Sequence, residues 1–86
     1  MLPENPLFSD TLGWVYYKKN LAQSAIPLLR ASVERAPREP VYHYHLGLAY
    51  AKGGDKARAR QSLEQALRLA PAFAGSADAK RVLATL

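Results

Sequence analysis

Two histidines are the residues of this chain best suited to bind a metal ion or to transfer a proton. His43 and His45 lie two positions apart, which on a helix places them on different sides. Two metal ligands on one helical face need a spacing of three or four residues. The chain contains no cysteine, so it offers neither a thiolate ligand nor a thiol nucleophile. The sequence therefore predicts no metal site and no cofactor.

A dense basic cluster is the next candidate for chemistry, because it could attract nucleic acid. Lys52, Lys56, Arg58 and Arg60 surround one acid, Asp55, in a chain of formal net charge +5. Nucleic-acid binding needs such charge on one face, preferably beside exposed aromatic side chains. This cluster crosses a predicted turn and then follows a helix whose outer side must be charged in any case. A solvated helix face is therefore favoured over nucleic-acid binding, and an acidic protein partner stays open.

No catalytic arrangement is evident elsewhere. The serines and threonines have no histidine at motif spacing, and Glu34, Glu39 and Glu64 stand singly. Gly53-Gly54 is a helix terminator rather than a phosphate-binding loop. No apolar run approaches the roughly 18 residues of a membrane span, and the first residues lack the pattern of a signal peptide. We therefore expect a binding protein rather than an enzyme, with its compartment open between cytoplasm and periplasm.

The elements that would position these residues repeat at an interval of 34 residues. Leu12-Gly13-x-x-Tyr16 returns as Leu46-Gly47-x-x-Tyr50. Six later positions repeat with it: Ala25 and Ala59, Leu29 and Leu63, Val33 and Leu67, Ala36 and Ala70, Pro37 and Pro71, and the turn residues Asn20 and Gly54. Apolar spacing and stop signals predict helices over about 6–19, 22–35, 40–52, 56–69 and 74–85. Pro27 inside the second helix predicts either a kink, which we favour, or a later helix start.

This pattern resembles the tetratricopeptide repeat, a helix-turn-helix unit of 34 residues. The resemblance implies an all-α fold, an α-solenoid of two hairpins whose small residues Gly13 and Gly47 lie at the helix crossings. Ser32 stands where the second copy has alanine, and a hydroxyl bond to the preceding turn would accommodate it. The resulting division is 1–5 as the tail of an upstream repeat, 6–39 as repeat one, 40–73 as repeat two and 74–86 as a capping helix. We interpret the chain as the C-terminal fragment of a longer bacterial protein.

The family resemblance also implies a function, because such repeats bind peptides or helices in a concave groove lined by the first helix of each hairpin. Carried over by position, the groove residues would be Leu7, Asp10, Trp14, Tyr17, Lys18, Val41, Tyr44, His45, Leu48, Ala51 and Lys52. Asp10 and Trp14 replace the lysine and asparagine with which some relatives clamp a terminal carboxylate. The expected ligand is therefore an apolar peptide or amphipathic helix, anchored on aromatic rings and steered by Lys18 and Lys52. His43 is expected to be a packed, hydrogen-bonded ring.

Three alternatives stay open at this point. The aromatic residues of the groove could simply pack on neighbouring helices, as we expect for the framework residues Tyr16 and Tyr50. The segment could be architectural, forming a homo-oligomer through Phe8 and Leu12 at its open N-terminal end. It could also be a regulatory appendage of an upstream catalytic domain.

Overall fold

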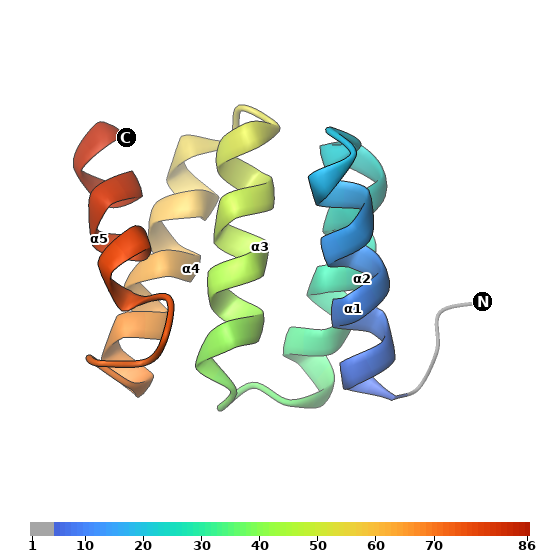
Figure 1. Ribbon diagram of the computed structural model, residues 1–86, viewed down its shortest axis with the longest axis horizontal. Helices are drawn as coiled ribbons and strands as arrows, with labels where there is room; N and C mark the ends of the chain where they lie inside the picture. The colour runs from blue at the N-terminus through green and yellow to red at the C-terminus, as the bar shows by residue number, and fades with distance from the viewer. Residues whose placement is uncertain (1–4) are drawn as a thin grey trace.

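A computed structural model describes residues 5–86, so the predicted upstream tail at 1–5 lies almost wholly outside the described residues. This part of the chain consists of five α-helices without a strand: α1 (Pro6–Lys18), α2 (Ala22–Arg35), α3 (Pro40–Lys52), α4 (Lys56–Leu69) and α5 (Ser76–Thr85). The helices form two layers, with α1, α3 and α5 in one and α2 and α4 in the other (Figure 1). The all-α prediction is confirmed, and α5 begins two residues later than expected.

The helix starts follow from capping chemistry. The side chain of Asn5 accepts a hydrogen bond of 2.8 Å from the N–H of Leu7, and Pro6 occupies the first turn. Asp55 likewise accepts a bond of 3.0 Å from the N–H of Arg58. Both bonds satisfy N–H groups that have no partner inside their helix. Helix α3 begins at Pro40, whose missing N–H costs nothing at that position.

The turns inside the two hairpins are copies of each other. Asn20 and Gly54, at equivalent positions, adopt left-handed backbone conformations with φ of 64° and 92°. Immediately after each, an N–H reaches back to the carbonyl of the framework tyrosine: Leu21 to Tyr16 and Asp55 to Tyr50, both over 2.9 Å. The left-handed residue reverses the chain so that these otherwise unpaired carbonyls are satisfied. Each turn therefore sends the second helix back along the first.

Within each hairpin the helices cross at a glycine. A Cβ atom added at Gly13 would lie 2.7 Å from Cγ of Leu29, and one added at Gly47 would lie 2.7 Å from Cγ of Leu63. Both leucines are fully buried. The missing side chain therefore lets each leucine fill the crossing, as the sequence predicts.

The second helix contains the two departures from the repeat pattern. Helix α2 runs unbroken through Pro27, so the alternative of a later helix start is wrong, while the kink stays a prediction. Pro27 is exposed and costs the bond that its N–H would have made to Gln23, one turn earlier. The hydroxyl of Ser32 donates a 2.7 Å bond to the carbonyl of Leu29. This is the predicted accommodation of a polar group at a fully buried position.

Candidate functional site

A row of stacked rings and lysines joins α1 to α3. Trp14 stacks on Tyr17, with ring centroids 4.7 Å apart, and on His45, at 3.9 Å. The Nζ atom of Lys18 lies 5.0 Å from the centroid of Trp14, and that of Lys52 lies 4.1 Å from the centroid of Tyr17. We call these five residues the aromatic row. The rings are half-buried and both lysines are exposed, so the row presents flat apolar surface with positive charge at its edge.

A buried carboxylate holds the histidine of the row in place. Both carboxylate oxygens of Asp10 lie within hydrogen-bond distance of Nδ1 of His45, at 2.8 and 3.0 Å. A carboxylate can only accept, so Nδ1 is the donor and carries the proton. Asp10 is buried, which corrects its assignment as an open groove residue. Its role is to orient the His45 ring against Trp14 across the junction of the two repeats.

The predicted anchor Tyr44 is engaged inside the structure. Its hydroxyl donates a 2.5 Å hydrogen bond to Oδ2 of Asp78 in α5, and its ring meets Phe73 edge-on at 5.5 Å. Burial, and then the bond to Asp78 and its charge, raise the pKa of Tyr44 far above its usual range. The same bond, together with one from Arg81, lowers the pKa of Asp78. Tyr44 therefore ties α3 to α5.

The other predicted groove residues divide by exposure. Leu48 is buried and packs with Leu63 and Ala79, so its assignment to the groove is wrong: α5 covers it. Leu7 is exposed, while Val41 and Ala51 are half-buried. Framework packing thus takes part of the surface that repeat position alone assigns to a ligand.

The second histidine has a structural partner. Nε2 of His43 lies 2.7 Å from the carbonyl oxygen of Pro37, so this ring closes the loop between α2 and α3. Residues 5–86 contain no group of three or more histidine, aspartate or glutamate side chains able to hold a metal ion. The two histidines therefore face different partners, in agreement with their spacing.

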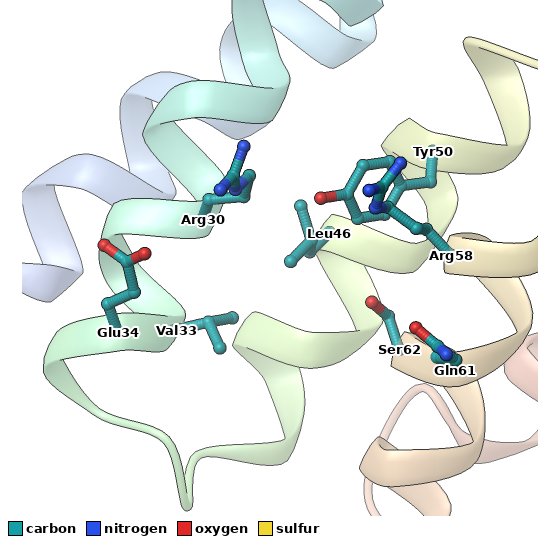
Figure 2. Close-up of a pocket in the computed structure, with 8 residues that line it drawn as sticks. All are labelled: Arg30, Val33, Glu34, Leu46, Tyr50, Arg58, Gln61 and Ser62. Atoms are coloured by element: carbon teal, nitrogen blue, oxygen red, sulfur yellow. The ribbon is translucent and has the colours of Figure 1, made fainter. Parts of the chain in front are cut away.

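A cleft that the sequence reasoning missed opens between α2 and α4. It encloses about 230 Å³, and Figure 2 shows Arg30 and Glu34 on one wall, Arg58 and Ser62 on the other. The framework residues Leu46 and Tyr50 of α3 lie between the walls. Arg58 is already paired with Asp55 over 2.9 Å, so the cleft has no dominant charge. Only the alternation of polar residues along two non-adjacent helices could have revealed it.

Two similar hairpins stacked side by side in two layers define a helical repeat protein. The family model described as Tetratricopeptide repeat matches residues 11–77, and the chain belongs to this family. Repeats of this family generally mediate protein–protein interaction. No curated protein matches the chain as a relative. Within the described residues, no helix is long and apolar enough to cross a membrane.

Proposed function

We propose that this chain is a protein-interaction module that binds a peptide or helix of a partner protein across the aromatic row. The row itself is the observation that supports the proposal. Trp14 and Tyr17 are large, nearly parallel rings, 13° from coplanar. Rigid aromatic side chains supply much contact area at low entropic cost and dominate many interfaces.

The lysines specify the chemistry of the partner. Lys18 and Lys52 lie over rings that are already partly covered, and a cation–π contact at an exposed site is worth about 0.5–1 kcal/mol. A carboxylate of the partner can therefore draw either ammonium group away at little cost. The chain's net charge of +5 favours the encounter with such a partner at low salt. The preferred ligand thus combines an apolar or aromatic side chain with a nearby aspartate or glutamate.

The chain contains its own reporter for this binding, because Trp14 is its single tryptophan. A random library of twelve-residue peptides displayed on phage would be selected on the chain. Enriched sequences would then be synthesised without tryptophan and titrated while Trp14 emission is followed. Saturable change in emission is the expected result. If selected peptides bind by calorimetry while Trp14 emission stays constant, the row is not the site.

A charge-matched pair of variants separates specific contact from general attraction. The double variant Lys18→Ala, Lys52→Ala removes two charges from the row, and the control Lys56→Ala, Lys80→Ala removes two exposed charges elsewhere. Loss of two contacts to a partner carboxylate should weaken binding by about tenfold, or about 1.4 kcal/mol. The control should follow the parent. Equal weakening in both variants would mean that only the overall charge matters.

A further inference from the structure

An apolar strip of α1 is open to solvent. Phe8, Leu12 and Val15 follow one another at intervals of four and three residues, so they share one side of the helix, and they are 64%, 41% and 43% exposed. We call these three residues the α1 face. Every exposed large hydrophobic of residues 5–86 lies between Leu7 and Leu21. The α1 face is on a different side of α1 from Trp14 and Tyr17, so it is separate from the aromatic row.

The second repeat shows what such a face does when it is covered. The positions equivalent to Leu12 and Val15, one period later, are Leu46 and Ala49, and they are only 5% and 0% exposed. They are buried in one cluster with Leu29 of α2, against which Ile26 and Val33 also pack. The same helix side that is open on α1 is therefore closed on α3 by the preceding second helix.

The rule holds again at the other end of the molecule. Helix α4 is the second helix of its hairpin, and its Leu63 is buried with Ala79 of α5, beside Val82 and Leu83. Neighbouring hairpins thus meet through the second helix of one and the first helix of the next. The chemistry of a cover is an apolar strip such as Ile26, Leu29 and Val33, spaced three and four residues apart.

We infer that the α1 face is a docking site for an amphipathic helix of a partner protein that presents the apolar spacing of α2. A second intact copy of this chain does not offer that helix. Helix α2 lies between α1 and α3, and α4 lies between α3 and α5, so both second helices are covered on two sides (Figure 1). The inference adds a binding surface to the one proposed above and does not depend on it.

The direct test uses a labelled peptide of residues 21–36 as the probe, because this segment covers α3 within the chain. Fluorescence anisotropy of the probe should rise saturably on titration with the full chain. Leu12→Glu should weaken binding by about tenfold or more, because a charge replaces an apolar side chain at the centre of the contact. Phe8→Glu, at the most exposed position of the face, repeats the test. The matched control Ala84→Glu places the same charge on an exposed position of α5 and should bind like the parent.

The probe carries a second control. A peptide with Leu29→Glu should lose binding to the parent chain, while one changed at the exposed Arg30 to glutamine should retain it. Circular dichroism should show that each chain variant keeps its helix content. The inference is overturned if the parent fails to bind the probe, or if Leu12→Glu and Ala84→Glu bind it equally. It is also overturned if sedimentation shows a dimer of the parent that Leu12→Glu dissociates, because the cover is then a second copy.

Discussion

Gly47→Ala tests whether close approach at the helix crossing sets the stability of the second hairpin. The new Cβ atom would lie 2.7 Å from Cγ and Cδ2 of Leu63 and 3.2 Å from its backbone nitrogen. Leu63 is fully buried, so it has no space to turn into, and α3 and α4 must separate. Overpacking of this kind costs about 1–3 kcal/mol. Alanine recovers about 1 kcal/mol because it is a better helix former than glycine. The free energy of unfolding should therefore fall by up to about 2 kcal/mol.

A double-mutant cycle isolates the steric part of this effect. Urea unfolding followed by circular dichroism would be measured for the parent, Gly47→Ala, Leu63→Ala and the double variant. Without the leucine side chain the added methyl group has room, so Gly47→Ala should then stabilise by about 1 kcal/mol. The expected coupling energy is about 1–3 kcal/mol. Leu67→Ala, one turn further along α4, serves as the control and should be additive with Gly47→Ala. A stabilised single variant with coupling below about 0.5 kcal/mol would refute the steric argument.

Three further predictions concern polar contacts. Asp10→Ala should lower the free energy of unfolding by about 1–3 kcal/mol, because Nδ1–H of His45 loses its acceptor in a half-buried site. Asp55→Ala should cost about 1 kcal/mol through loss of the α4 N-cap, measured by urea unfolding. Stability should also fall below about pH 4 and above about pH 10. The lowered pKa of Asp78 contributes stability that protonation removes. The raised pKa of Tyr44 contributes stability that is lost as the unfolded chain ionises first.

Each of these predictions has a sharp control. Asp55→Asn should restore most of the capping energy, since asparagine also accepts from an N–H. Tyr44→Phe should remove its part of the loss above about pH 10, and an unchanged alkaline limb would contradict the assignment. Asp10→Ala should also change the emission of Trp14, because the ring stacked on it is freed. Constant emission would show that Asp10 does not position His45.

The hairpins themselves could be predicted from the sequence because their determinants are local and repeat. The left-handed turn residues Asn20 and Gly54, and the glycines at both crossings, are demanded by backbone geometry. A hydroxyl at Ser32 can reach only a carbonyl of the preceding turn, and it does. Such features depend on residues a few positions apart, so a single chain is enough to infer them.

The candidate site was less predictable because it depends on how hairpins stack. Asp10 is covered only because His45, 35 residues later, lies against it. Leu48 is covered by α5, whose sequence departs from the repeat pattern. Equivalent positions in two repeats therefore differ in exposure according to what lies next to them. Position within a repeat predicts the side of the helix, but not whether a neighbour occupies it.

The two copies of the repeat also separate packing from function. Positions that are identical in both copies, such as Gly13 with Gly47 and Leu29 with Leu63, are mostly buried and are explained by the crossing. Lys18 with Lys52 is different, because the same charged residue recurs at a position that is exposed in both copies. Burial does not account for this identity. Each lysine instead lies over a ring of the aromatic row, 5.0 Å and 4.1 Å from its centroid. A ligand that reads both lysines at the spacing of neighbouring repeats would account for it, and this is why the lysine pair rather than the single tryptophan is the decisive variant.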